Sequence, residues 1–329
     1  MNDILCPSDR RIVVLDGYVA NSGDLSWSEL CALGDLKVYE RTSPAQIVDR
    51  CRGAYAVFVN KVIIDSETIA LLPDLRFIGV LATGYNNVDV TAAHRAGITV
   101  CNVPAYSTAS VVQTVFSLLL ALTNRVESYS SSVARGEWTA CRDFSYRLSP
   151  IEELDGLTMG VYGLGNIGSR GAATAHAFGM NVISLTSKSQ DHLPDYIEKV
   201  TKDELFGRAD VLSLNAPLSA DNVRFVNADT LARMKSTAIL INTSRGGLVD
   251  EQALAEALRS HRIAAAGLDV LEHEPPLADC PLIGLDNCLI TPHVAWQSTA
   301  SRRRLLSISA DNLAAFLSGA PQNVIESAV

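Results

Sequence analysis

The chain has 329 residues, of which 48% are hydrophobic and 19% charged, and its formal net charge is −9. This length is about twice that of an ordinary domain, so we expect two domains, each with a sizeable core. The negative charge disfavours a nucleic acid or an anionic membrane as partner, because both require a basic face. The most apolar stretch, Val111 to Leu122, is too short to cross a bilayer.

The cysteines are scattered along the chain and form no C-x-x-C pair. They are Cys6, Cys31, Cys51, Cys101, Cys141, Cys280 and Cys288. This distribution predicts neither a metal site nor a disulfide framework, and it suits a cytoplasmic protein.

Short apolar runs rich in β-branched residues alternate with helical patterns, which predicts an α/β fold with parallel sheets. Five strands are expected in the first part of the chain: Arg11–Leu15, Leu36–Tyr39, Ala54–Val59, Phe77–Leu81 and Thr99–Cys101. Six more are expected in the second part: Thr158–Tyr162, Asn181–Leu185, Asp210–Leu214, Ala238–Asn242, Ala265–Asp269 and Cys288–Thr291. The two groups indicate two separate sheets.

Two helical patterns are expected to connect the domains. The first runs from Thr108 to Val126, and the second, Ser298 to Leu317, is expected to return and pack on the first domain. We therefore predict a discontinuous domain made of residues 1–103 and 299–329. A second domain, residues 104–298, would be inserted into it.

A glycine-rich loop follows the predicted strand Thr158–Tyr162 and opens a helix that ends near Phe178. The loop has the pattern G-x-G-x-x-G and reads Gly163, Leu164, Gly165, Asn166, Ile167 and Gly168. Glycines let the backbone approach a pyrophosphate, and the helix N-terminus offers unpaired N–H groups to it. The loop therefore predicts a dinucleotide site, the alternative being a tight turn without a ligand.

The end of the next predicted strand bears on which dinucleotide is bound. NAD-specific sites usually place an acid there, to accept a hydrogen bond from the ribose 2′-OH. This chain has Thr186, Ser187 and Lys188, and the first carboxylate is Asp191. Hydroxyls and a cation suit a 2′-phosphate, so NADP(H) is expected to be favoured, with NAD(H) as the other option. Alternatively, Lys188 is an ordinary solvated residue.

Three side chains suited to carbonyl reduction each come after a predicted strand. Arg245 could bind a carboxylate and polarise the neighbouring carbonyl, or form a surface salt bridge. His293 is the candidate proton donor because imidazole titrates near neutrality, with His273 as the competing histidine. Glu274 is the candidate carboxylate partner of His293.

The order of four motifs resembles that of the D-isomer-specific 2-hydroxyacid dehydrogenases over nearly the whole chain. The motifs are the glycine-rich loop, Asn242-Thr243-Ser244-Arg245-Gly246, Glu274-Pro275-Pro276 and Thr291-Pro292-His293. The resemblance implies a flavodoxin-like substrate domain built from both ends of the chain, a Rossmann cofactor domain between them, and an active site in the cleft.

The resemblance also implies roles for single residues. Arg245 would bind the substrate carboxylate and carbonyl, His293 would be the acid/base, and Glu274 would be its partner. Backbone N–H groups of a substrate loop would hold the carboxylate, at Ala82, Thr83 and Gly84. Further cofactor contacts are implied at Ala216, Pro217, Thr243, Ser244 and Asp269, the last of these near the nicotinamide. Asn215-Ala216-Pro217 departs from the usual segment, which carries His or Cys.

Within the family the sequence most resembles the glycerate dehydrogenases, also called hydroxypyruvate reductases. The resemblance rests on residues 81–86, residues 102–107 and Trp296, a candidate substrate contact. It implies reduction of hydroxypyruvate or glyoxylate to the D-2-hydroxy acid, with hydride from the nicotinamide and a proton from His293. The alternatives are a D-lactate or 2-ketogluconate reductase, or a dinucleotide-sensing, corepressor-like protein without catalysis.

A homodimer is expected because of the segment Ser128 to Pro150. It is long for a connection in a compact domain and contains Trp138, Phe144 and Tyr146. The family that the chain resembles also pairs through this region. The alternative is a loop that folds back on its own domain.

Overall fold

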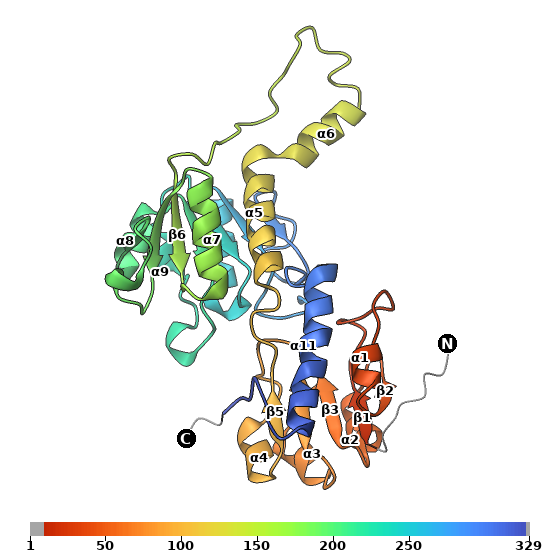
Figure 1. Ribbon diagram of the computed structural model, residues 1–329. Coiled ribbons are helices and arrows are strands. Elements are labelled where there is room, and N and C mark those ends of the chain that lie inside the picture. The colour runs from red at the N-terminus through yellow and green to blue at the C-terminus, as the bar shows by residue number, and fades with distance from the viewer. Residues whose placement is uncertain (1–9, 327–329) are drawn as a thin grey trace. The chain divides into compact units, whose positions relative to one another are not determined.

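The computed structural model describes residues 10–326. The chain divides into two compact units, shown in Figure 1. Unit 1 combines the residues up to Ser107 with those from Gln297 onward, and unit 2 consists of Thr108–Trp296. The sequence placed these boundaries after residues 103 and 298.

Unit 1 contains a parallel sheet with the strand order β2-β1-β3-β4-β5. Its strands are β1 (Arg11–Val14), β2 (Asp35–Val38), β3 (Ala56–Val59), β4 (Phe77–Val80) and β5 (Thr99–Cys101). Its helices are α1 (Ser28–Cys31), α2 (Ile47–Cys51), α3 (Ser66–Ala70), α4 (Val90–Arg95) and α11 (Thr299–Leu317). This order is that of the flavodoxin-like folds. The central strands β3 and β4 are buried throughout, as helices on both faces of a parallel sheet require.

Unit 2 contains a parallel sheet with the order β12-β11-β10-β9-β6-β7-β8. Its strands are β6 (Thr158–Tyr162), β7 (Asn181–Leu185), β8 (Ile197–Lys199), β9 (Val211–Leu214), β10 (Ile239–Asn242), β11 (Ala265–Leu268) and β12 (Cys288–Ile290). This is the Rossmann order with one further strand, β12, at the edge. The predicted fold class is therefore confirmed. The strand order reverses between β6 and β9, which is where such sheets bind ligands.

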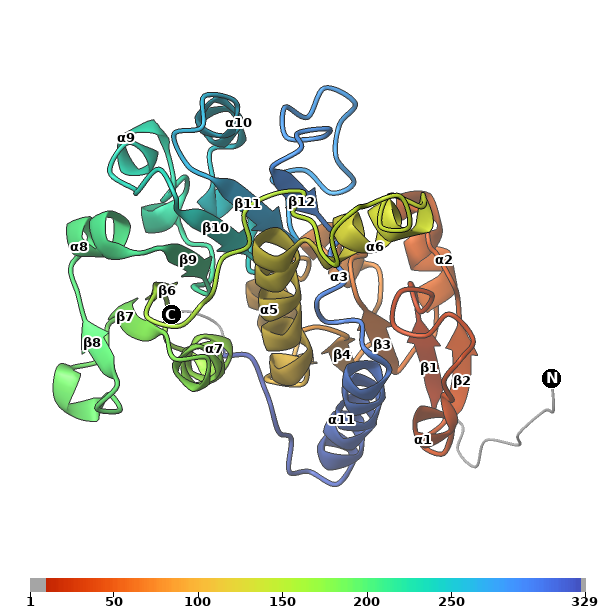
Figure 2. The ribbon, with the colours of Figure 1, turned by 90° about the horizontal axis from the view of Figure 1, so that it is seen from above.

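Unit 2 has six α-helices, and all of them except α6 cover the two faces of its sheet (Figure 2). They are α5 (Thr108–Asn124), α6 (Val126–Ala134), α7 (Asn166–Ala177), α8 (Lys202–Arg208), α9 (Ala228–Leu231) and α10 (Glu251–Arg259). Residues of α5 and α7 share one buried apolar cluster, and residues of α8, α9 and α10 share the other. The two cores fix the sheet between two helical layers, so its strand ends form a rigid edge.

Two local predictions were wrong. The edge strand β8 was not expected, because a three-residue strand with two exposed charged residues gives no apolar run. The long helix was expected to continue to Val126, but α5 ends at Asn124 and Arg125 adopts a left-handed conformation with φ of +50°. The chain then forms α6, inside the segment that was expected to be a loop.

No single helix among residues 10–326 is long and apolar enough to span a membrane. Only α5 and α6 together reach that length and hydropathy, and they are bent by 55° at their junction. Eight residues of α5 are buried, and the helix packs against β10, β11 and α7.

Free thiols are present at Cys51, Cys101, Cys141, Cys280 and Cys288. Cys31 is disulfide-bonded, which the scattered spacing did not predict. In the described part of the chain, no group of three or more His, Cys, Asp or Glu side chains could hold a metal ion.

Candidate active site

Two of the predicted catalytic residues, Arg245 and His293, and the predicted cofactor contact Asp269 follow neighbouring strands of the unit 2 sheet. Arg245 follows β10, Asp269 directly follows β11, and His293 follows β12. These three strands are parallel neighbours, so their carboxyl ends lie at the same edge. The sheet therefore gathers residues that are far apart in the sequence.

His293 and Glu274 form a close pair. Nδ1 of His293 lies 2.6 Å from Oε2 of Glu274, and the side chains are 28% and 34% exposed. Oε1 of Glu274 accepts from the backbone N–H of Leu271 at 3.1 Å, which fixes the carboxylate on its own loop. Because an ionised carboxylate can only accept, Nδ1 carries the proton and Nε2 is left for another partner. The ring is thus oriented for proton exchange through Nε2.

Asp269 anchors the segment that carries His293. Its side chain is 1% exposed, and Oδ1 accepts from Thr291 Oγ1 at 2.6 Å and from the Val294 N–H at 2.9 Å. Oδ2 accepts from the Ala295 N–H at 2.9 Å, and the Asp269 carbonyl accepts from the His293 N–H at 2.8 Å. The buried charge is stabilised by these donors, which also hold His293 at a positive φ of +53°. The expected contact of Asp269 with the nicotinamide stays a prediction.

Arg245 lies in a turn that is organised by the buried Asn242. Oδ1 of Asn242 accepts from the N–H and Oγ of Ser244, at 3.0 and 2.9 Å, and its Nδ2 donates to the Arg245 carbonyl at 2.9 Å. The Arg245 side chain is exposed and donates to the Ser244 carbonyl at 2.8 Å through Nη1. A guanidinium has five N–H donors, so most remain available for an anion.

The glycine-rich loop fits a pyrophosphate. A Cβ on Gly163 would lie 2.7 Å from the backbone nitrogen of Ala216, and a Cβ on Gly168 would lie 2.0 Å from the Gly163 carbonyl oxygen. A Cβ on Gly165 would meet nothing within 4 Å, so the backbone is open there. The N–H groups of Leu164 and Gly165 donate to no group in the described residues. Close packing behind the loop and free donors on its open side are what a pyrophosphate requires.

Other predicted cofactor residues lie at the same edge of unit 2. Thr243 follows β10, and its Oγ1 is buried without a hydrogen-bond partner, as expected of a group that a ligand would complete. Ala216 and Pro217 follow β9 beside the glycine-rich loop. Thr186 follows β7, and its Oγ1 accepts from the Lys188 N–H at 3.3 Å.

The predicted substrate loop belongs to unit 1, where residues 81–84 follow β4. The N–H groups of Ala82, Thr83 and Gly84 donate to nothing in the described chain, whereas the carbonyls of Leu81, Ala82 and Thr83 all accept hydrogen bonds. The loop therefore presents free donors, as a carboxylate site must. Trp296, the other predicted substrate contact, is partly buried and ends unit 2.

Sequence reasoning missed the residues that hold the site in place. Asn242 and Thr291 were parts of motifs without an assigned role, and Asp269 was assigned to the cofactor alone. Their hydrogen bonds join segments from different strands, which local patterns do not reveal. An Asn or Thr at the carboxyl end of a buried strand was the available signal.

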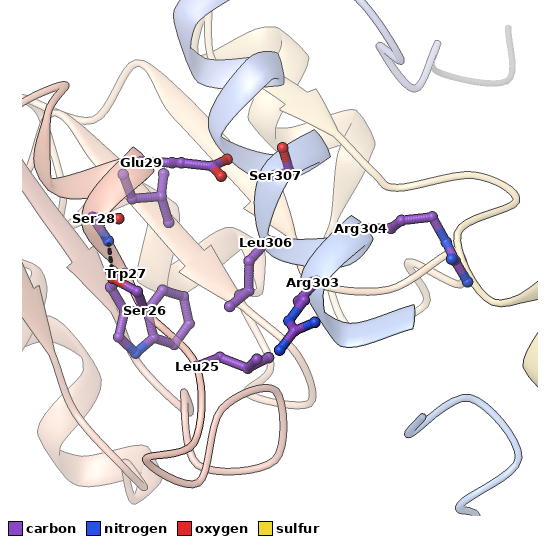
Figure 3. A pocket seen from close by; sticks show the side chains of 10 residues that line it. Leu25, Ser26, Trp27, Ser28, Glu29, Arg303, Arg304, Leu306 and Ser307 are labelled. Carbon is purple, nitrogen blue, oxygen red and sulfur yellow. Dashed lines mark hydrogen bonds between the residues drawn. The ribbon is translucent and has the colours of Figure 1, made fainter. Parts of the chain in front are cut away.

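Unit 1 also has a surface pocket of about 420 Å³ between the chain around α1 and the helix α11 (Figure 3). Its walls include Leu25, Trp27 and Leu306, with Arg303 near them. None of the predicted site residues lines this pocket, so it is separate from the chemistry described above.

Comparison with known proteins gives one family. The protein-family model described as "D-isomer specific 2-hydroxyacid dehydrogenase, NAD binding domain" matches residues 116–295. A hydroxypyruvate reductase from Blautia hydrogenotrophica is 43% identical over 96% of this chain and 99% of its own length. A glycerate dehydrogenase from Methylorubrum extorquens is 39% identical over 96% of this chain and 99% of its own length.

Solved structures agree with this similarity. An acyclic imino acid reductase in complex with NADPH and D-Arg superposes with a TM-score of 0.84 at 31% identity, covering 96% of this chain and all of its own. A D-lactate dehydrogenase with NAD⁺ from Lactobacillus jensenii gives 0.81 at 28% identity, covering 97% of this chain and all of its own. The two neighbours hold different nicotinamide dinucleotides on the same fold.

Proposed function

This chain belongs to the D-isomer-specific 2-hydroxyacid dehydrogenases, and we propose that within the family it reduces hydroxypyruvate or glyoxylate to the D-2-hydroxy acid. It is an oxidoreductase that uses a nicotinamide dinucleotide. The observation that carries the proposed reaction is the His293–Glu274 pair on the same sheet edge as Arg245. The choice of substrate is supported by the names of the two relatives above.

The side chains provide the groups that carbonyl reduction needs. When bound, the nicotinamide supplies the hydride that the 2-carbon accepts. His293 donates the proton on Nε2 to the forming alkoxide, while Glu274 keeps the ring in place through Nδ1. Arg245 binds the carboxylate and stabilises the developing negative charge. In unit 1, the free N–H groups of Ala82, Thr83 and Gly84 are donors suited to a carboxylate.

The test is steady-state turnover with a panel of 2-oxo acids, using NADH and NADPH in turn. We expect the highest kcat/KM with hydroxypyruvate or glyoxylate, and lower values with pyruvate and 2-ketogluconate. A preference for pyruvate would favour the D-lactate alternative. Cofactor binding without consumption of any 2-oxo acid would instead favour the corepressor-like alternative.

We also propose that NADPH is used at least as well as NADH. Support comes from the turn after β7, where Thr186 and Lys188 stand in the place of an acid. The Lys188 side chain is exposed and makes no hydrogen bond or ion pair in the described chain. A charge-assisted contact with a 2′-phosphate would contribute about 1.5–3 kcal/mol, or about 10- to 150-fold in discrimination. The double variant Thr186→Asp with Lys188→Ala should therefore shift the preference toward NADH. A wild-type kcat/KM for NADH tenfold above that for NADPH would refute the proposal.

A homodimer through α6 and the segment after it is proposed as well. This segment leaves α5 and extends away from the sheet of unit 2 (Figure 1). Val126 is 67% exposed, Trp138 51% and Phe144 90%. Large apolar side chains exposed together are typical of a surface that a partner covers. Light scattering should show a dimer at micromolar concentration, and Phe144→Asp should shift it toward the monomer. Exposed Ile63→Asp, in unit 1, is the control, and a wild-type monomer would exclude the proposal.

A further inference from the structure

Three carbonyl groups of the substrate loop, residues 81–84, accept hydrogen bonds from neighbouring segments. The Leu81 carbonyl accepts from Nδ2 of Asn60 at 2.6 Å, and the Thr83 carbonyl accepts from Nδ2 of Asn102 at 2.7 Å. Between them, the Ala82 carbonyl accepts from the Val103 N–H at 3.0 Å. The N–H groups of Ala82, Thr83 and Gly84 donate to nothing in the described chain, so the three peptide groups from Leu81 to Gly84 have a bonded carbonyl and a free donor each.

The first asparagine is fixed from behind by a carboxylate. Asp16, in the segment after β1, accepts from three consecutive N–H groups: Asn60 at 2.7 Å, Lys61 at 2.5 Å and Val62 at 2.9 Å. Asn60 is 4% exposed, and its Oδ1 is buried without a partner. A buried, unsatisfied carbonyl lowers stability. The Asn60 side chain therefore has one hydrogen bond, from its NH₂ group to the Leu81 carbonyl, and an unsatisfied Oδ1.

The second asparagine is connected to the helix α11. The Asn102 carbonyl accepts from Nδ2 of Asn312 at 2.9 Å, and Oδ1 of Asn312 accepts from Nδ2 of Asn323 at 2.8 Å. Asn312 is 2% exposed. Thr83 also donates through Oγ1 to the Val103 carbonyl at 2.8 Å. A continuous line of amides thus runs from α11 to the loop.

We propose that Asn60 and Asn102 are positioning residues for the carboxylate of the 2-oxo acid. By binding the carbonyls of the loop from both flanks, they fix the peptide planes whose N–H groups bind the substrate. A neutral amide is suited to this role, because a lysine or arginine in its place would itself attract the carboxylate. Preorganised donors spare the substrate the entropy of ordering the loop. The inference rests on the proposed function, since it assumes a 2-oxo acid on this loop.

The experiment compares wild type, Asn60→Ala, Asn102→Ala and Asn102→Asp at saturating cofactor. Each variant loses one neutral hydrogen bond to the loop, so the KM for hydroxypyruvate should rise about tenfold. The KM for glyoxylate should rise by the same factor, because the two acids share the carboxylate. The dissociation constant of NADPH, followed by its fluorescence, should not change. Asn102→Asp should behave like Asn102→Ala, because a carboxylate cannot donate to Thr83.

Ser309→Ala is the matched control. Ser309 is 2% exposed on α11, and within residues 10–326 its hydroxyl donates only to the Leu305 carbonyl of its own helix, at 2.7 Å. It should leave both KM values unchanged. The two asparagines lie on opposite flanks of the loop, so failure of one variant to fold leaves the other as a test.

Each outcome separates the proposals. If wild type turns over a 2-oxo acid while KM stays unchanged in the folded asparagine variants, the positioning role is refuted and the proposed function stands. A higher KM accompanied by equal decreases in kcat and in NADPH affinity, together with a lower Tm, would indicate a merely structural role. That result would also refute the positioning role. Wild type without turnover on any 2-oxo acid would refute both.

Discussion

Replacing Asp269 by Asn tests whether this buried carboxylate holds His293 in place. Oδ1 accepts from the Val294 N–H and Oδ2 from the Ala295 N–H, both at 2.9 Å. An amide in either orientation therefore sets an N–H donor against one of these N–H groups. One charge-assisted hydrogen bond is lost and a buried donor is left without a partner, which should lower the free energy of unfolding by about 2–4 kcal/mol.

The same change should slow the reaction. The segment 293–295 would move to relieve the donor–donor contact, and a displacement of about 1 Å at a catalytic group costs up to ~10²-fold in rate. We therefore expect kcat to fall by about 10- to 100-fold, measured at saturating substrates. Urea denaturation followed by circular dichroism gives the stability.

Asp210→Asn is the control for the loss of a carboxylate. Asp210 accepts from the Thr158 N–H at 2.9 Å and from Nζ of Lys235 at 2.8 Å, at the opposite edge of the same sheet. Its loss should lower stability but leave kcat near the wild-type value. If Asp269→Asn also keeps a wild-type kcat, Asp269 does not position His293 and our reasoning fails.

Three further outcomes are expected. His293→Ala should lower kcat by about two to four orders of magnitude with an unchanged dissociation constant for the cofactor, and near-normal turnover would remove His293 from the mechanism. Hydrogen bonding to Arg302 lowers the pKa of Asp24 from 3.8 to about 2, so the pair stabilises fully above pH 4 and progressively less as the pH falls toward 2. The difference in unfolding free energy between wild type and Asp24→Asn should shrink over that range in urea titrations, and a constant difference would contradict the ion pair. Burial raises the pKa of the Cys51 thiol to about 12, so iodoacetamide at pH 8 should alkylate Cys141 and spare Cys51 in the native protein, and equal labelling by mass spectrometry would show otherwise.

Most strands could be predicted from the sequence because a strand buried on both faces is a continuous apolar run. Ala56–Val59 and Phe77–Val80 are of this kind. The edge strand Ile197–Lys199 has a partner on one side only and exposed charges, so no run marks it. The helix break at Arg125 was missed because the sequence around it contains no glycine or proline.

The candidate site, too, contains residues that the sequence indicated and contacts that it could not indicate. The sequence indicated Arg245, Glu274 and His293 because ionisable groups after buried strands are unusual, and the structure brings the last two within 2.6 Å. The supporting contacts could not be predicted. Asn60 contacts Leu81, and Asn312 contacts Asn102, across 21 and 210 residues of sequence, and only the folded sheet brings them together.

The division of the chain into an interrupted unit 1 and an inserted unit 2 has a consequence for biosynthesis. During translation, the first five strands emerge well before the helix α11 that packs against β4, and before Ile325, whose N–H donates to the Val100 carbonyl. At about 5–20 residues per second, the ribosome needs roughly 10 to 40 s to deliver the intervening unit 2. Unit 2 can therefore complete its core on the ribosome, whereas the face of the unit 1 sheet that α11 covers stays exposed until α11 has been synthesised. The nascent chain is consequently most prone to aggregation through the part of unit 1 that is synthesised first.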